Sequence, residues 1–325
     1  SHSDIQVEPV IKWSRFKKKN TLADFLPQKE CQLWSGLFRR SQPGDIYHGP
    51  DFKISGSFRG PKIVTVHDMV VFEQKYNAPS FYQKGIRDLT KVLQSSSVQA
   101  VIANSHFTKS EILRHFPLLQ GRVHVTHLGC DRFAMRSSVS SLALPEKYIL
   151  FVGTLEKRKN IQRLIAAFEM LKEQGCSEEL VLAGGWGFGA EEIRQQLETS
   201  RFRSSIHHLN YVSQEHLAEL YQRARVFFFP SLYEGFGIPA LEAMQAGCPV
   251  VVSQGGALEE ICGQAALTVN ALDVEAMAAT VKQLLLSEDL REEMSRRGQE
   301  QACLYTWENC ARDTIAVYKQ VLGSL

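Results

Sequence analysis

Short apolar runs alternate with longer amphipathic segments along nearly all of the 325 residues. Apolar runs of four or five residues bounded by turn residues are typical of buried parallel strands, whereas apolar residues that recur every three or four positions are typical of helices. This alternation predicts an α/β protein built on parallel sheets. The chain is long enough for two domains of ordinary size.

The predicted strands form two series, one in each half of the chain. They cover residues 45–48, 62–66, 100–103 and 123–126 in the first half, and residues 148–152, 180–183, 226–230 and 249–252 in the second. Residues 137–144 are rich in serine and small residues and predict a linker. We therefore expect two Rossmann-like, doubly wound domains, 1–142 and 143–305, that face a cleft at the carboxyl ends of their strands.

Helices are predicted over residues 111–116, 160–172, 213–221, 271–286, 289–301 and 307–322. Thr108 and Glu111 fit a capping box at the start of the first of these helices. Asn160 and Ser213 are favourable N-caps for the second and third.

The segment from Glu234 to Glu242 is the most informative motif of the chain. Its glycines allow a tight turn, and Pro239 suits the first turn of a helix. A helix N-terminus favours an anion, yet two glutamates flank this one and would repel a phosphate that touched them. We therefore expect the glutamates to hold hydroxyl groups beside a phosphate, as in a nucleotide sugar. The alternative is that both are ordinary carboxylates near a helix N-terminus.

Two cations, Arg158 and Lys159, follow the strand that ends at Gly153 and precede the predicted helix at Asn160. Cations are unfavourable at a helix N-terminus unless an anion lies there. This arrangement predicts a phosphate site. The alternative is that the two stems cover apolar surface and their charged ends stay in water.

Polar residues also follow strands of the first half. His67 and Asp68 come directly after residues 62–66, so His67 is expected to reach into the cleft, unless it is a structural histidine bonded to backbone. His48 lies at another strand end and is open to either reading. Ser105 follows a third strand and either contributes a hydroxyl to the cleft or caps a helix.

Residues 185–190, Gly-Trp-Gly-Phe-Gly-Ala, fit a loose dinucleotide-binding fingerprint. That fingerprint requires an acidic residue about twenty positions later for the ribose, and residues 200–214 contain none. A nicotinamide oxidoreductase is therefore disfavoured. The glycines are expected to let backbone approach a ligand or to close a turn.

Composition excludes several classes of protein. The net charge of +2 gives no nucleic-acid footprint, and the seven cysteines form no Cys-x-x-Cys pair. We therefore expect a reducing compartment, no disulfide frame and no thiolate metal site. The chain also has no Asp-x-Asp pair of the kind that holds a divalent ion in many sugar-nucleotide enzymes, so no metal is expected and Arg158, Lys159 and helix dipoles would neutralise a leaving diphosphate.

Together these segments resemble family 4 of the retaining glycosyltransferases, which have the GT-B fold. The resemblance covers about nine-tenths of the chain and is densest after residue 148. It rests on Phe-Val-Gly-Thr-Leu-Glu-Lys-Arg-Lys-Asn (151–160), Tyr-Val-Ser (211–213), Phe-Pro-Ser-Leu-Tyr-Glu-Gly-Phe-Gly-Ile-Pro-Ala-Leu-Glu-Ala-Met (229–244), Gly-Cys-Pro-Val-Val (247–251), Glu260, Gly263 and Thr-Trp-Glu (306–308). In the first half it rests on residues 45–48, 66–68, 103–109 and 127–131.

The resemblance implies a role for each site residue. Glu234 would lie near the donor sugar's hydroxyls, Glu242 would hold the ribose, and Arg158 and Lys159 would bind the diphosphate. His67 would lie beneath the reacting sugar. Further donor contacts would come from Gly153, Thr154, Val212 (to the base), Phe236, Gly237, Ile238 and Leu241, and acceptor-side candidates are His48, Asp68 and Ser105. The last helix, within residues 306–325, would cross back onto the first domain, which would be the acceptor side.

Two departures from the family pattern stand out. Many relatives have arginine directly after the glycine of residues 151–153, where this chain has Thr154, so Arg158 and Lys159 would carry more of the charge. The family's opening strand and glycine-rich loop have no match, because residues 4–11 resemble a later strand. We therefore expect that unit to be absent or shortened, which bears on activity.

Within the family the chain looks most like bacterial mannosyltransferases of O-antigen and exopolysaccharide assembly. The resemblance implies transfer of a hexose, mannose from GDP-mannose, to a saccharide or lipid-linked acceptor with retention and without a further cofactor. A UDP-sugar donor and a non-catalytic nucleotide-sugar-binding subunit are the alternatives. A cytoplasmic location is expected, and cations among residues 12–19 and 39–40 suit peripheral contact with the inner membrane, although a solvated face explains them as well.

Overall fold

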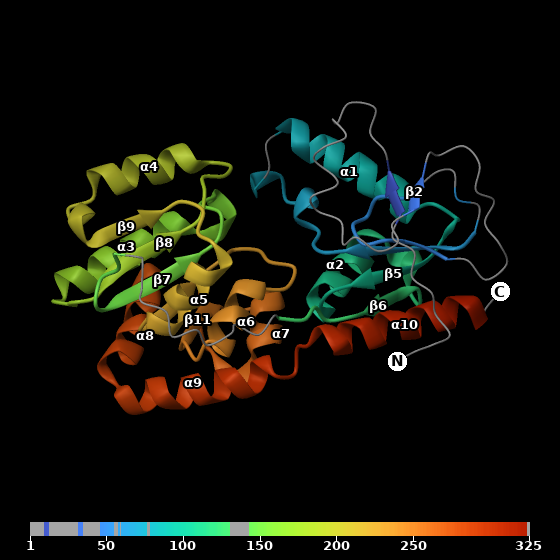
Figure 1. The fold of residues 1–325 in the computed structure, drawn as a ribbon. Helices are drawn as coiled ribbons and strands as arrows, with labels where there is room; N and C mark the ends of the chain where they lie inside the picture. Colours follow the sequence, from blue (N-terminus) through green and yellow to red (C-terminus); the bar gives the residue numbers. More distant parts are fainter. Residues whose placement is uncertain are drawn as a thin grey trace.

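The computed structural model describes residues 10–12, 32–34, 46–54, 58, 60–76, 79–130 and 143–323. Two parallel sheets, each covered by helices, form the two lobes of the molecule (Figure 1). The predicted α/β class with two Rossmann-like domains is therefore confirmed. The linker residues 137–142, Asp131 and residues 4–9 lie outside the described residues, as do all the predicted membrane-facing cations except Lys12, of which only the backbone is described.

The second domain contains a six-stranded parallel sheet in the order β12-β11-β10-β7-β8-β9. Its strands are β7 (Tyr148–Val152), β8 (Glu179–Ala183), β9 (Ile206–Leu209), β10 (Val226–Phe229), β11 (Val250–Ser253) and β12 (Leu267–Val269). The apolar runs that predicted these strands are buried on both faces, as expected for a parallel sheet between helices. Strands β9 and β12, at the two edges, were not predicted, because their short sequences carry little apolar signal.

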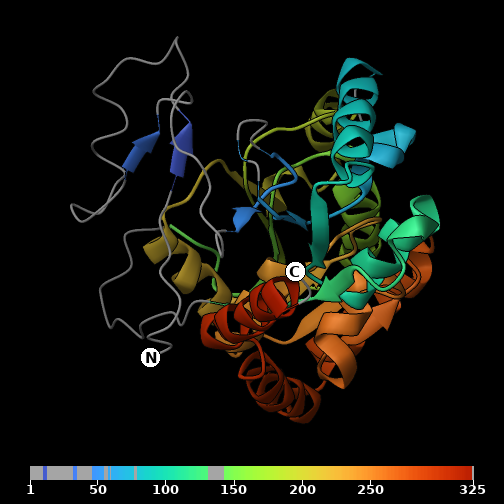
Figure 2. The ribbon, with the colours of Figure 1, turned by 90° about the vertical axis from the view of Figure 1, so that its right-hand side faces the viewer.

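The first domain contains a four-stranded parallel sheet in the order β3-β4-β5-β6. Its strands are β3 (Tyr47–Gly49), β4 (Lys62–Val66), β5 (Val98–Ala103) and β6 (Val123–Val125). Two further short strands, β1 (Val10–Lys12) and β2 (Gln32–Trp34), pair in parallel with each other outside this sheet (Figure 2).

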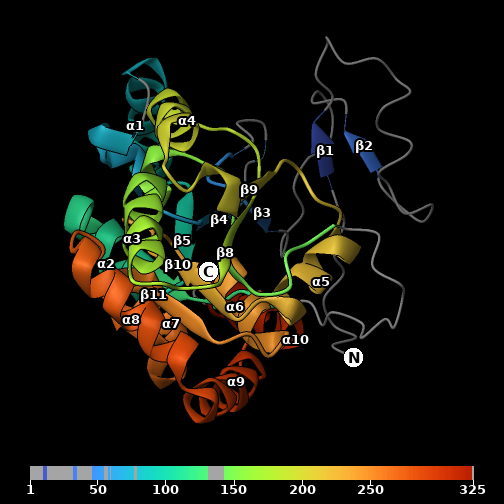
Figure 3. The same ribbon diagram turned by 90° about the vertical axis from the view of Figure 1, so that its left-hand side faces the viewer.

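The helices connect the strands and cover both faces of the sheets. They are α1 (Pro79–Leu93), α2 (His106–His115), α3 (Ile161–Glu173), α4 (Ala190–Thr199), α5 (Gln214–Arg223), α6 (Ile238–Gln245), α7 (Gly256–Cys262), α8 (Val274–Leu286), α9 (Glu288–Ala302) and α10 (Trp307–Gly323). In the second domain α3 and α8 pack together on one side of the sheet and α5 and α6 on the other (Figure 3). This is the doubly wound arrangement that the alternation predicted.

One predicted helix start, that of α2, and one predicted N-cap, that of α3, are wrong. Helix α2 begins at His106, because Ser105 rather than Thr108 is its N-cap and accepts a hydrogen bond from the Thr108 amide. Helix α3 begins after Asn160, as predicted, but the Asn160 side chain does not cap it. Asn160 is left-handed, with φ 62°, and its amide nitrogen donates to the carbonyls of Pro230 and Ala271. The side chains of Thr108 and Asn160 thus bond to groups far away in the chain, which the local sequence does not reveal.

Other helix predictions fit more closely. Ser213 caps α5 as expected, by accepting a hydrogen bond from the His216 amide. The helix predicted from residue 271 begins instead at Val274, because the Asp273 carboxylate caps it. Helices α1, α4 and α7 were not predicted.

Helix α10 crosses from the second domain to the first (Figures 1 and 2). Its residues Val317 and Val321 pack against Ile63, Ala100 and Ile102 of the first sheet. The crossing is also polar, since His48 Nδ1 lies 2.6 Å from the Tyr318 hydroxyl and His48 Nε2 lies 2.8 Å from Thr65 Oγ1. The described residues therefore hold His48 between the first sheet and α10 through both ring nitrogens, as expected for a structural histidine.

The His48 contacts predict a dependence of stability on pH. Burial, with a smaller effect of His67, lowers the pKa of His48 from 6.5 to about 4. The unfolded chain then binds a proton that the folded chain does not between these values, so stability falls as pH falls from 6.5 towards 4. We expect a loss of about 2 kcal/mol from this residue between pH 7 and pH 5. Urea unfolding at the two pH values measures it, with His48→Gln as the variant that should show a smaller difference; an equal difference in both proteins would contradict the assignment.

Candidate active site

The glycine loop, residues 234–237, joins β10 to α6 and carries the central charge of the site. The Glu234 carboxylate accepts hydrogen bonds from Lys159 Nζ at 2.5 Å, Arg158 Nη1 at 3.0 Å and Ser231 Oγ at 2.6 Å. Burial acts to raise the pKa of Glu234, but the charges of Lys159 and Arg158 together hold it below its usual value. Glu234 is therefore ionised and is the counter-ion of both cations.

The anion beside Arg158 and Lys159 is a carboxylate of the protein itself. Both lie in a 3-10 turn, η6 (Lys157–Lys159), that precedes α3. Two cations there were predicted to need an anion, and Glu234 and Glu156 supply negative charge, since Arg158 Nη2 also donates to Glu156 Oε1 at 2.7 Å. A bound phosphate would thus have to share these cations with Glu234.

The first domain contributes Asp68 to the same charged cluster. Its carboxylate accepts a hydrogen bond from the Val70 amide at 3.0 Å. Burial raises the pKa of Asp68, and this effect outweighs the amide bond and the charge of Arg158. Asp68, Arg158 and Glu234 therefore influence one another across the two domains.

The glycine loop is in direct contact with the first domain. A Cβ added to Gly235 would lie 1.9 Å from the His67 carbonyl oxygen, so no other residue fits there without a shift. The Gly235 carbonyl accepts hydrogen bonds from Ser105 Oγ at 2.7 Å and Thr108 Oγ1 at 3.0 Å. Ser105, for which the sequence left two readings open, thus caps α2 and contacts the loop.

After the glycine loop the chain enters α6 through Gly237, whose φ of 122° favours glycine. Ile238 is the first helical residue and Pro239 follows it, as predicted for a helix N-terminus. The Leu241 side chain is buried, and its amide donates to the Gly237 carbonyl at 3.3 Å. The backbone amide that was predicted to contact the donor at this position therefore already has a partner within α6.

Glu242 lies one turn further along α6. The hydroxyl of Tyr221, which is fully buried, donates to Glu242 Oε2 at 2.9 Å. Burial and the charge of Glu242 raise the pKa of Tyr221 well above its usual value, so the tyrosine stays a hydrogen-bond donor. Helix α5 therefore orients Glu242, and Val212 lies two residues before the same helix, next to the second domain's core.

The other predicted donor contacts lie at the carboxyl end of β7. Gly153 has a φ of 144°, and Thr154 after it is exposed. A Cβ added to Gly184 would lie 2.0 Å from the Gly153 carbonyl oxygen. Gly184, the first residue after β8, therefore allows the loops after β7 and β8 to approach each other.

His67 is exposed, and its Nε2 lies 2.8 Å from the Pro50 carbonyl oxygen. His67 is thus hydrogen-bonded to backbone, as one of its two interpretations held. Its ring lies at the end of β4 and is exposed to solvent.

A second contact between the domains involves Glu260 of α7. Its two carboxylate oxygens accept hydrogen bonds from the His106 amide at 2.7 Å and the Phe107 amide at 2.8 Å, and His127 Nε2 lies 3.3 Å away. Burial acts to raise the pKa of Glu260, but His127 and the two amides hold it below its usual value. No role for Glu260 was predicted from the sequence, because the N-terminus of α2 that it caps lies about 150 positions earlier in the chain.

His106, His127 and Glu260 are also the group of possible metal ligands that meets within the described part of the chain. Both Glu260 oxygens are already used by backbone amides of α2. These three residues are therefore explained by hydrogen bonds that join the two domains.

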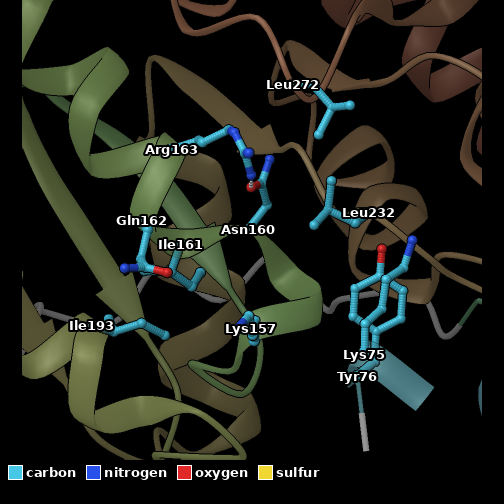
Figure 4. Close-up of a pocket in the computed structure, with 10 residues that line it drawn as sticks. All are labelled: Lys75, Tyr76, Lys157, Asn160, Ile161, Gln162, Arg163, Ile193, Leu232 and Leu272. Atoms are coloured by element: carbon cyan, nitrogen blue, oxygen red, sulfur yellow. Dashed lines mark hydrogen bonds between the residues drawn. The ribbon is translucent and has the colours of Figure 1, made fainter. Parts of the chain in front are cut away.

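A cavity of about 230 Å³ lies beside the η6 turn, lined by residues of both domains (Figure 4). It is lined by Lys75 and Tyr76 of the first domain and by Lys157, Asn160, Ile161, Gln162, Arg163, Ile193, Leu232 and Leu272 of the second. None of these residues is a predicted donor contact, so this cavity is distinct from the charged cluster at Glu234.

Within the described residues, we find no helix with the length and apolar character needed to cross a bilayer.

Two family models match the chain. "Glycosyl transferases group 1" matches residues 136–301, and "Glycosyltransferase Family 4" matches residues 11–132. The O-antigen chain mannosyltransferase B of Escherichia coli is 36% identical over 286 residues, which cover 84% of this chain and 74% of that protein. The chain belongs to glycosyltransferase family 4.

One further relative and one solved structure are similar to this glycosyltransferase. The MMP alpha-(1->4)-mannosyltransferase of Mycolicibacterium hassiacum is 27% identical over 81% of this chain and 66% of its own length. The sucrose-phosphate synthase of Thermosynechococcus elongatus has a similar fold, with a TM-score of 0.69 and 23% identity over 81% of this chain and 68% of that one. The glycosyltransferase thus has the GT-B fold, and its mannosyltransferase-like character follows from its relatives.

Proposed function

We propose that this glycosyltransferase transfers mannose from GDP-mannose to a saccharide or lipid-linked acceptor in the synthesis of a cell-surface polysaccharide. The observation that carries the proposal is the buried pairing of Lys159 and Arg158 with Glu234 beside the N-terminus of α6. Two cations and a helix N-terminus at one point favour a diphosphate, and the adjoining glutamates can accept hydrogen bonds from hydroxyls. Mannose is proposed from the relatives that are named mannosyltransferases.

The proposed reaction needs no divalent metal and no cofactor besides the donor. As the bond from sugar to phosphate breaks, negative charge grows on the diphosphate, and Lys159, Arg158 and the α6 N-terminus are proposed to stabilise it. Glu234 holds both cations in place before the donor binds. Activity should survive a chelator; abolition by chelator with rescue by magnesium or manganese would overturn this part.

We further propose that the product keeps the α configuration of the donor. The relative whose name specifies an α-(1->4) linkage supports this choice. Retention by a front-face mechanism needs no protein nucleophile, so the protein's work is to orient the sugar and stabilise the leaving group. His67, exposed at the end of β4, is proposed to lie beneath the sugar.

The donor is tested by a thermal-shift screen of GDP-mannose, UDP-glucose and ADP-glucose, followed by NMR of the product. Stabilisation by GDP-mannose together with an α-linked mannoside is the expected result. Response to a UDP sugar alone would correct the donor, a β-linked product would remove the retaining mechanism, and binding without turnover would favour a non-catalytic subunit. Location in the cytoplasm and contact with the inner membrane remain predictions, which cell fractionation checks.

Glu242→Ala is expected to weaken the binding of free GDP about tenfold or more, because a carboxylate suited to hydrogen-bond the ribose is lost. Tyr221 holds this carboxylate in the structure, so its position is defined before a ligand arrives. Calorimetry with GDP measures the effect. Glu219→Ala, which removes a carboxylate bonded to Arg223 on α5, is the matched control and should bind GDP normally. Equal affinities in the two variants would contradict the ribose role.

A further inference from the structure

The carbonyl group of Gly235 receives two hydrogen bonds from the other domain. Ser105 Oγ and Thr108 Oγ1, both with no exposed surface, donate to it at 2.7 Å and 3.0 Å. A carbonyl oxygen has two lone pairs, so these two hydroxyls satisfy it completely. The first turn of α2 thus holds one peptide group of the glycine loop.

The directions of these two hydrogen bonds are fixed by their surroundings. Ser105 Oγ accepts a hydrogen bond from the Thr108 amide at 2.9 Å, so its own proton is free to point to Gly235. Carbonyl oxygens only accept, so Thr108 must donate as well. The two hydroxyls are therefore ordered donors in a site that water does not reach.

Gly235 stands between the two parts of the proposed donor site. Glu234, which binds Lys159 and Arg158, precedes it, and Gly237 and the N-terminus of α6 follow it. The contact of Gly235 with the His67 carbonyl leaves no space for sideways movement of the loop towards the first domain. Where Glu234 points is thus linked to where α2 lies.

Helix α2 is itself held at a second point by the other domain. The Glu260 carboxylate accepts the His106 and Phe107 amides, which are adjacent to Ser105. The same helical turn therefore receives a cap from α7 and gives two hydroxyls to the glycine loop. Both contacts form only when the domains are together.

We propose that Ser105 and Thr108 are positioning residues that hold the glycine loop, and through it Glu234, in its working geometry only when the two domains are closed. This inference rests on the proposed function for its effect on catalysis. It assigns the acceptor-side domain a direct part in shaping the donor site. Neither residue needs to touch the donor.

Thr108→Val is the sharpest test, since valine keeps the branched shape in its buried position and removes only the hydroxyl. We expect kcat with GDP-mannose to fall about five- to tenfold, and about fiftyfold or more in the double variant with Ser105→Ala, because each lost bond leaves part of a buried carbonyl unpaired. The affinity for free GDP should change by less than about twofold, since these hydroxyls act on the geometry of Glu234 and not on the nucleotide. Thr108→Ser, which keeps the hydroxyl, should restore most of the rate.

Ser110→Ala is the matched control, because the Ser110 hydroxyl lies on the exposed side of α2 and bonds to the Phe107 carbonyl within the helix. Amide hydrogen exchange of residues 234–241 is the second readout and does not depend on turnover. Exchange should be several-fold faster in Thr108→Val and unchanged in Ser110→Ala.

Equal exchange in wild type and Thr108→Val would overturn the inference, even if the wild type transferred no sugar. An unchanged kcat in the double variant of an active enzyme would overturn it as well. Absence of turnover with every nucleotide sugar would instead remove the proposed function, while the exchange result would still decide whether the hydroxyls hold the loop. The two failures are therefore distinguishable.

Discussion

Lys159→Met is expected to lower turnover by about two to three orders of magnitude, the loss typical for one preorganised charge that stabilises a transition state. Lys159 Nζ lies 2.5 Å from Glu234 Oε1 and 4.9 Å from the centre of the Phe229 ring. These contacts hold the ammonium group in position before the donor binds. Methionine keeps the apolar stem against Phe229 and removes only the charge. Steady-state kinetics with GDP-mannose measures the loss.

The same substitution removes one partner of a buried ion pair, so a loss of folding must be separated from a loss of catalysis. Removing one partner of such a pair costs about 3 kcal/mol or more, although Arg158 remains bonded to Glu234. Thermal unfolding of each variant shows how much protein is folded at the assay temperature. Lys157→Met is the matched control, since Lys157 is exposed on the same turn and lines the separate cavity. A folded Lys159→Met enzyme within about threefold of the wild-type rate would exclude the charge role.

Gly235→Ala is expected to lower turnover by about a hundredfold or more, because an ångström-scale misplacement of catalytic groups has effects of that size. The added Cβ would lie 1.9 Å from the His67 carbonyl oxygen and 2.8 Å from Asp68 Cβ. Backbone cannot yield as a flexible side chain does, so the domains or the glycine loop must move apart. Glu234 would then lose the position that its neighbours define.

Gly185→Ala is the control for this substitution. Gly185 also lies in a loop after a strand, but an added Cβ would meet no atom within 4 Å. We expect Gly185→Ala to behave as wild type in both turnover and thermal unfolding. If Gly235→Ala were as active as Gly185→Ala, close contact of the domains at the glycine loop would not be required for the reaction.

Much of the fold was predictable because it depends on patterns that are local in sequence. The runs 62–66, 148–152 and 226–230 are continuous apolar segments between turn residues, and each is a central strand: the first two ranges coincide with β4 and β7, and β10 ends one residue earlier than predicted. Ser213 was recognised as a cap because its own helix supplies the amide that it accepts. Thr108 was misread as a cap because its hydroxyl serves a carbonyl far away in the chain, and no local pattern distinguishes the two uses.

The sequence by itself determined the α/β class, the two domains, the family resemblance and the residues of the glycine loop, since these follow from periodicity and from the order of residues along the chain. Only the tertiary structure decided which charges meet. Arg158 and Lys159 were expected to bind a phosphate, and both pair with Glu234 about 75 positions later, while Arg158 also pairs with Glu156. Ion pairs and capping contacts act over a few ångströms in space, whatever the separation in sequence, so this pair becomes visible only once β7 and β10 lie side by side in one sheet.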